Sequence, residues 1–399
     1  KMRALFIILF YFLFDRELLN ILHSEQLTYV FTAVSKVFSI IIIAILLLKH
    51  REKKMIAFFG YIFLPFFCML LSTIINDGNI RTVFTVMYPI FSLAALIIWQ
   101  CDTLYRTVYF VRCISILYFS LAVINFIFLI LSPSYFVSNS GDMYFLGGEN
   151  HIGYPLIKGL CFVLLDYYFT GNKIYLFTYL IVHITTILIV FSGSNMIGLF
   201  CMILFVIPNP LSRLIRNLSL CRLLMMFSGV FVFIILLGNL NVLLNTSLAS
   251  YVIEGLLGKE LTLSYRTIIW DMVIDGFFNS PFIGNGIRDT VNLFYISERY
   301  TTGYMSAHNQ ILQSLYECGI LFFISLVPVV YNVSNKCQYA VPFVGNIFKA
   351  TYCAILVMFM GEAPGMDKLL SMFIIGIGVS LKCDQYALES FRSGINIKR

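Results

Sequence analysis

Polar and charged residues that could do chemistry gather in one stretch, residues 264–319, which lies between two long apolar runs. The stretch contains three arginines and a histidine–asparagine pair: Arg266, Arg288, Arg299, His308 and Asn309. A guanidinium stays charged and binds phosphate oxygens through two parallel hydrogen bonds. A neutral imidazole can take a proton from a hydroxyl group near neutral pH. These residue types could therefore bind an anionic group and activate a hydroxyl beside it.

Each of these residue types also has a simpler interpretation. Arginines in a long loop can face water, because long loops escape the charge rule that governs membrane proteins. Arg266 fits that interpretation least well, since Tyr265 and Trp270 would hold it on a mostly apolar helix. His308, at the start of an apolar run, could simply cap a helix. Both interpretations remain open from residue types alone.

A turn is predicted between the arginines. Gly284, Asn285 and Gly286 follow Pro281 closely, a composition that marks a tight turn. A loop that cradles phosphate needs more glycines and a following helix. The sequence therefore predicts a turn here and gives only weak support for phosphate binding by its backbone.

The composition places the chain in a membrane. Of its 399 residues, 60% are hydrophobic and only 12% are charged, whereas soluble domains carry about a quarter charged residues. Runs of about 20 apolar residues cross a bilayer as helices, because lipid offers the backbone no hydrogen bonds. We predict an all-α polytopic membrane protein, with one transmembrane domain over residues 1–399. The expected helices are 3–22, 27–48, 55–75, 82–100, 107–131, 153–170, 174–191, 196–208, 223–241, 309–331, 347–361 and 368–381.

The distribution of basic residues predicts the orientation of these twelve helices. The net charge of +7 is explained by lysines and arginines in cytoplasmic loops, the densest being residues 49–54. Alternation from that loop puts both termini in the cytoplasm and residues 242–307 in a large extracytoplasmic loop that carries the active site. Its apolar stretches 248–257 and 265–278 are too short or too polar to span, which predicts interfacial helices.

Several classes of function are disfavoured. The ten cysteines are scattered with no CxxC pair, which favours apolar packing over a disulfide framework or a metal site. The chain has no nucleotide-binding glycine loop, no HExxH or GxSxG motif and no Asp-x-Asp pair. We therefore expect no cofactor, no metal and no nucleic-acid partner. Ion-coupled transport needs ionisable residues in mid-membrane, and the apolar runs show no convincing set.

The polar stretch also has a recognisable order of elements. They are Tyr265-Arg266 and Trp270, then Pro281-Phe282-Ile283-Gly284-Asn285-Gly286, then Ala307-His308-Asn309, and finally Leu312, Leu315, Glu317, Gly319 and Ile320. This order resembles the O-antigen ligase/polymerase superfamily of bacterial surface-polysaccharide enzymes. Two earlier outer segments, 149–151 and 192–194, also look like segments of that family. One residue departs from its pattern, because Asn195 stands where the family often has arginine.

The resemblance implies a glycosyltransferase that uses a polyprenyl-pyrophosphate-linked donor. Such an enzyme moves a glycan from undecaprenyl pyrophosphate to an acceptor sugar hydroxyl outside the membrane, without metal or nucleotide. His308 would be the catalytic base. The expected substrate-binding residues are Arg266, Arg288, Arg299, Asn309 and Trp270. The implied partners are the lipid-linked oligosaccharide, membrane lipid and a chain-length regulator protein. The implied location is the bacterial cytoplasmic (inner) membrane, with the active site on its periplasmic face.

Three functions remain as alternatives. We favour a polymerase, which joins lipid-linked repeat units. An O-antigen ligase, which moves the finished glycan to lipid A core, shares the same motifs. A flippase for lipid-linked oligosaccharides belongs to a different class, and its cationic residues should line a cavity within the helices. A flippase would not need a His-Asn pair at the mouth of a large outer loop.

Overall fold

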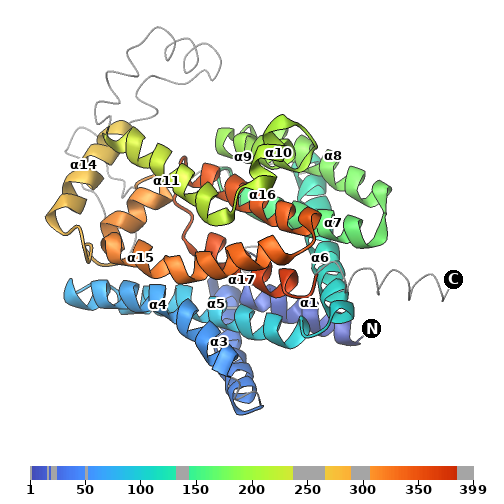
Figure 1. The fold of residues 1–399 in the computed structure, drawn as a ribbon, viewed down its shortest axis with the longest axis horizontal. Coiled ribbons are helices and arrows are strands. Elements are labelled where there is room, and N and C mark those ends of the chain that lie inside the picture. Colours follow the sequence, from blue (N-terminus) through green and yellow to red (C-terminus); the bar gives the residue numbers. More distant parts are fainter. Residues whose placement is uncertain are drawn as a thin grey trace, which may run out of the picture.

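The computed structural model describes residues 2–15, 18, 25–49, 53–131, 143–236, 266–288 and 306–383, and these are mostly helical (Figure 1). A helix overlaps each of the twelve expected apolar segments, but the first ends at Phe14 instead of residue 22, and residues 237–241 of the ninth lie outside the described residues. The helices are α1 (Met2–Phe14), α3 (Glu25–Lys49), α4 (Lys53–Ile75), α5 (Ile80–Gln100), α6 (Leu104–Leu131), α7 (Gly153–Thr170), α8 (Lys173–Val190), α9 (Gly193–Val206), α11 (Leu220–Leu236), α15 (Gln310–Tyr339), α16 (Pro342–Phe359) and α17 (Asp367–Ser380).

Two shorter helices and two short strands are also described. The short helix α10 (Pro210–Asn217) lies between α9 and α11, and α14 (Arg266–Asn279) forms where the apolar stretch 265–278 predicted an interfacial helix. The strands β1 (Met143–Tyr144) and β2 (Gly147–Gly148) pair antiparallel in a small hairpin before α7. The stretch 248–257, also predicted to be an interfacial helix, lies outside the described residues.

Six of the described helices are long and apolar enough to cross a membrane. These candidate spans are Phe58–Ile75, Ile80–Gln100, Leu104–Leu131, Lys173–Val190, Gln310–Tyr339 and Pro342–Phe359. Large apolar side chains on their outer faces are exposed, as expected for surfaces that face lipid tails. The fold is therefore that of a multi-pass helical membrane protein. The number of twelve spans and the position of both termini remain predictions.

The centre of the bundle is formed by α7, α16 and α17. Every residue of α17 is buried, and α16 and the first part of α7 are nearly as enclosed. A helix that is apolar on all sides is expected to be surrounded by other helices, and α16 packs against α7, α9, α15 and α17. Figure 1 shows α16 and α17 in orange-red within the bundle, with α14 beside α15 at one edge.

Helix α15 is not continuous. Gly319 interrupts it with φ 66° and ψ −172°, a backbone conformation that is essentially restricted to glycine. The break divides α15 into a first half, residues 310–318, and a longer second half that ends at Tyr339. The first half directly follows His308 and Asn309, so its direction determines where these two residues lie.

Candidate active site

The two residues of the His-Asn pair have different roles at the start of α15. Asn309 caps the helix, because its side-chain oxygen accepts hydrogen bonds from the backbone N–H groups of Ile311 and Leu312 at 3.0 and 3.1 Å. Its amide nitrogen lies 3.4 Å from the carbonyl oxygen of Met360. Asn309 is 2% exposed, so from inside the protein it links the start of α15 to the end of α16. The capping role that could have explained His308 therefore belongs to Asn309.

His308 lies beside a buried carboxylate. Its Nδ1 atom is 3.5 Å from Oε2 of Glu362, and the side chain of Glu362 is 6% exposed whereas that of His308 is 31% exposed. The backbone of His308 has φ 44°, which is uncommon for a residue with a side chain. Nδ1 is buried and makes no hydrogen bond within the described residues, so its contact with Glu362 is one of proximity, while the partly exposed ring remains accessible to a substrate.

Glu362 lies in the loop between α16 and α17, and this loop is fixed on the start of α15. The carbonyl oxygen of Glu362 accepts a hydrogen bond from the backbone N–H of Gln310 at 3.1 Å. The side chain of Gln310 in turn accepts one from the N–H of Gly365 at 2.5 Å. Sequence reasoning predicted this loop but did not single out Glu362. The available signal was a carboxylate in a short loop on the same predicted side as His308.

Helix α14 packs against the residues around His308. The indole N–H of Trp270 donates a hydrogen bond to the carbonyl oxygen of Ala307 at 2.8 Å. Beneath this bond, a small apolar cluster joins α14 to the first half of α15; its buried members are Ile269, Val273, Ala307 and Leu312. Trp270, expected to bind substrate, therefore anchors α14 to the residue that precedes His308.

The structure describes one of the three predicted arginines completely, one in its backbone only and one not at all. Arg266 is the first residue of α14 and lies one helical turn before Trp270, on the same side of the helix. Its backbone is therefore near the Trp270–Ala307 contact; its side chain lies outside the described part. Arg288 is exposed, next to Ile287, whose carbonyl oxygen accepts from the N–H of Asn79. Arg299 lies outside the described residues.

The turn after Pro281 uses its backbone within the protein. The N–H groups of Asn285 and Gly286 donate to the carbonyl oxygens of Tyr316 and Glu317 at 2.8 and 2.9 Å, and that of Gly284 donates to Ser280. A turn was predicted here and is present. These N–H groups are engaged by α15 and by Ser280, so the weakly supported interpretation as a phosphate cradle is not favoured.

The two earlier outer segments lie side by side. Ser192 donates a hydrogen bond to the side chain of Asn150 at 3.1 Å, and the amide of Asn195 donates to the carbonyl oxygen of Glu149 at 3.0 Å. Asn195 is completely buried. This residue, which stands where an arginine was expected, therefore joins α9 to the segment before α7 and does not present its amide to a ligand.

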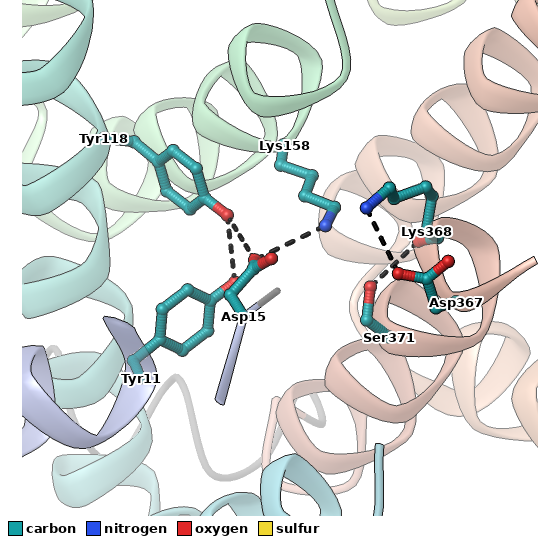
Figure 2. A network of polar contacts seen from close by, with 7 residues as sticks. All are labelled: Tyr11, Asp15, Tyr118, Lys158, Asp367, Lys368 and Ser371. Carbon is teal, nitrogen blue, oxygen red and sulfur yellow. Dashed lines mark hydrogen bonds and ion pairs between the residues drawn. The ribbon is translucent and has the colours of Figure 1, made fainter. Parts of the chain in front are cut away.

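A second polar cluster, shown in Figure 2, was missed by the sequence analysis. Oδ2 of Asp15 accepts a hydrogen bond from the hydroxyl of Tyr118 at 2.9 Å and lies 3.4 Å from Nζ of Lys158. The side chains of Lys158 and Asp15 are 1% and 5% exposed. On the facing helix α17, Lys368 pairs with Asp367 at 3.1 Å. Ionisable side chains are therefore buried inside the bundle. The sequence analysis did not recognise them as a set because they lie far apart in the sequence.

This cluster provides a test of what holds the bundle together. Replacing Lys158 by methionine leaves the buried Asp15 carboxylate without this cation, and breaking one side of a buried ion pair destabilises a protein by roughly 3–5 kcal/mol. We expect a clear fall in the midpoint of thermal unfolding in detergent. Lys173→Met is the matched control, since Lys173 is exposed at the start of α8. Equal unfolding midpoints for the two variants would show that the Lys158–Asp15 pair contributes nothing.

The geometry defines a class before any family is considered: a multi-pass membrane protein with a histidine–carboxylate pair at the mouth of a broken helix. Residues 178–327 match the family described as O-antigen ligase. The predicted relationship to the O-antigen ligase/polymerase superfamily is thereby confirmed, and the matched region contains Arg266, Trp270, the turn after Pro281 and His308. No curated protein and no solved structure matches the chain.

The match supports a general type of activity. Members of this family are glycosyltransferase-like enzymes of the ligase or polymerase type that act on lipid-linked polysaccharide. The chain is accordingly a multi-pass membrane protein of polysaccharide biosynthesis. Its particular reaction, donor and site residues belong to the proposal that follows.

Proposed function

We propose that this protein is a polymerase of bacterial surface polysaccharide. It transfers an undecaprenyl-pyrophosphate-linked glycan to an acceptor sugar hydroxyl of another lipid-linked repeat unit, on the periplasmic face of the cytoplasmic membrane. The observation that carries the proposal is the contact of 3.5 Å between Nδ1 of His308 and the buried Glu362. The placement of Arg266 one turn before the Trp270–Ala307 bond supports it.

The pair can act as a general base with an orienting carboxylate. The 3.5 Å contact would have to tighten into a hydrogen bond from Nδ1–H to Glu362 when substrate binds. Nε2 is then the unprotonated nitrogen and can accept a proton from the acceptor hydroxyl. The carboxylate then stabilises the positive charge that the ring gains, as in other histidine–carboxylate pairs. The ring is 31% exposed, which leaves it open to a sugar hydroxyl.

The transfer forms one bond and breaks another. The acceptor oxygen bonds to the anomeric carbon while its proton passes to His308, and the bond from that carbon to the pyrophosphate breaks. The bonding electron pair leaves on the pyrophosphate, so charge develops there in the transition state. A guanidinium from Arg266, aided by Arg288 and Arg299, would stabilise that charge. The pyrophosphate linkage is already activated, and no nucleotide is required.

Attack from the side opposite the pyrophosphate would invert the anomeric centre. The helices would hold the polyprenyl tail along their lipid-facing surface and so align the donor with the acceptor. Comparing the anomeric configuration of the product linkage with that of the lipid-linked donor tests this step. Retention of configuration would contradict direct attack by the acceptor.

One assay tests the proposed reaction. Purified protein is incubated with lipid-linked repeat units, without added metal or nucleotide, and the lipid-linked products are separated by size. We expect a ladder of longer glycans. Arg266→Ala should lower the yield by about 10²-fold or more, because it removes charge stabilisation in the transition state. Arg213→Ala, an exposed arginine of α10, is the matched control and should retain activity. A full ladder from Arg266→Ala would refute the role of Arg266.

The ligase is the second candidate, favoured by the description of the matching family as O-antigen ligase. Deleting the gene separates the alternatives. Loss of a polymerase should leave single repeat units on the surface anchor, whereas loss of a ligase should leave polymer on the carrier lipid. Loss of a flippase, the alternative from another class, should leave repeat units on the cytoplasmic side.

A further inference from the structure

The break in α15 leaves backbone groups that a continuous helix would satisfy itself. An unpaired backbone group is costly at membrane depth, and the segment after α14 supplies the missing partners. The carbonyl oxygens of Tyr316 and Glu317 accept from the turn as described above. In return, the N–H groups of Ile320 and Leu321 donate to the carbonyl oxygens of Pro281 and Phe282 at 2.9 and 3.1 Å. The turn is therefore inserted into the break.

Two glycines permit this close insertion. A Cβ atom at Gly319 would overlap the carbonyl oxygen of Phe282, and one at Gly284 would lie 2.5 Å from the backbone of Glu317 and Cys318. Both glycines also have positive φ. The turn and the break thus form one continuous unit, in which neither backbone can be moved away without leaving polar groups unpaired.

The inserted turn is also fixed to helix α4. The hydroxyl of Ser72 donates to the carbonyl oxygen of Glu317 at 2.6 Å and accepts from the N–H of Gly286 at 3.1 Å. The amide of Asn76 donates to the carbonyl oxygen of Gly284 at 3.0 Å. Helix α4 is a candidate membrane span. The end of the first half of α15, at Glu317, is therefore attached to a helix of the bundle.

The same segment holds the near end of this half-helix, through the bond from Trp270 to Ala307. We call residues 266–287 the bracket, because they contact residues 307–318 at both ends. Asn285 connects its parts: its amide nitrogen lies 3.0 Å from the carbonyl oxygen of Gly276 in α14 and 3.1 Å from that of Tyr316. Its backbone N–H also bonds to Tyr316.

We propose that Asn285 is a positioning residue, which fixes the first half of α15 through the bracket and thereby aligns His308 with Glu362. His308 lies before the start of the half-helix, whereas Asn285 contacts the carbonyl oxygen of Tyr316 near its end. Loosening the bracket would change the direction of the half-helix and so displace His308, without removing any group that meets the substrate. The consequence for catalysis rests on the proposed function of His308, whereas the consequence for the half-helix does not.

The experiment compares Asn285→Ala with wild-type protein by two measurements. The first is hydrogen–deuterium exchange, which should become faster at the amides of residues 311–318 and remain unchanged at residues 322–334. The second is the transfer reaction, in which kcat should fall about 10- to 100-fold, the effect of a small misplacement of a catalytic group, while KM for the lipid-linked donor stays the same. In a His308→Ala background, Asn285→Ala should cause no further loss.

Two further variants keep the test decisive. Asn332→Ala is the matched control, because this asparagine of the second half of α15 also donates to a backbone carbonyl, that of Pro328 at 2.9 Å; it should alter neither measurement. Ser72→Ala removes the side-chain hydrogen bonds to Glu317 and Gly286, and it should change both measurements in the same direction as Asn285→Ala. It serves as the test if Asn285→Ala does not fold.

Several results would overturn the proposal. Unchanged exchange at residues 311–318 in both Asn285→Ala and Ser72→Ala would show that the bracket does not hold the half-helix. A loss of kcat that persists at full size in the His308→Ala background would show that Asn285 does not act through His308. If wild-type protein transfers no glycan, the proposed function fails, and the exchange measurement still decides whether the bracket holds the half-helix.

Discussion

Replacing His308 by alanine is expected to lower the rate of glycan transfer by about 10²- to 10⁴-fold, leaving a slow but measurable rate, while the protein remains folded in the membrane. A positioned general base contributes about 10²–10⁴-fold to a rate, and His308 is the described residue whose partly exposed ring faces a buried carboxylate. The loss should appear in kcat, because the imidazole acts on the acceptor proton in the transition state. The measurement is the initial rate of product formation with purified protein and lipid-linked repeat units.

The matched control is His50→Ala, in the basic loop predicted to lie in the cytoplasm. It removes the same side chain and should leave the rate unchanged. Membrane abundance and the thermal unfolding midpoint of both variants must equal those of wild type for the comparison to hold. A His308→Ala variant that makes full-length polymer as fast as wild type at normal abundance would refute the assignment of His308 as base.

Glu362→Gln is the second large effect, and it tests the residue that sequence reasoning missed. Glutamine keeps the size of the side chain but cannot stabilise the positive charge that forms on the imidazole. In enzymes that pair a histidine with a carboxylate, the corresponding amide lowers kcat by about 10⁴-fold. We expect a fall of roughly 10²- to 10⁴-fold in kcat here, with little change in KM for the donor.

The control for this variant is Asp102→Asn, which neutralises an exposed carboxylate that pairs with Arg106 on the surface. Surface ion pairs contribute little, so the control should behave as wild type. If Glu362→Gln transfers glycan as fast as Asp102→Asn, the carboxylate has no part in catalysis. If Glu362→Gln acts only through folding, its unfolding midpoint will fall together with its rate.

The helices could be predicted because each is encoded locally. A long apolar run specifies a membrane helix whatever lies around it, and a helix overlaps each of the twelve expected runs, although the first ends early, at Phe14. The order of Arg266, Trp270 and His308 also predicted a common region, which α14 and α15 now form. The capping function of Asn309 could have been read from its residue type, since asparagine is among the preferred caps of a helix.

The contacts that complete the site could not be predicted, because they join residues distant in sequence. Nothing near His308 indicates that Glu362 will face it, since that contact depends on how the loop after α16 folds over α15. Gly319 suggests a weak point in a helix, but its neighbours do not indicate that the carbonyls of Pro281 and Phe282 will meet the break. In the same way, neither Asp15 nor Lys158 identifies the other as its partner.

The pairing of Asp15 with Lys158 has a consequence for how the chain is made. The two residues are 143 positions apart, so Asp15 leaves the ribosome long before its partner exists. A lone charge in a membrane helix costs roughly 3 kcal/mol or more on insertion scales, so Lys158 is less costly inside the bundle once Asp15 lies beside it. The contact between the end of α1 and α7 can therefore form only after α7 has been synthesised.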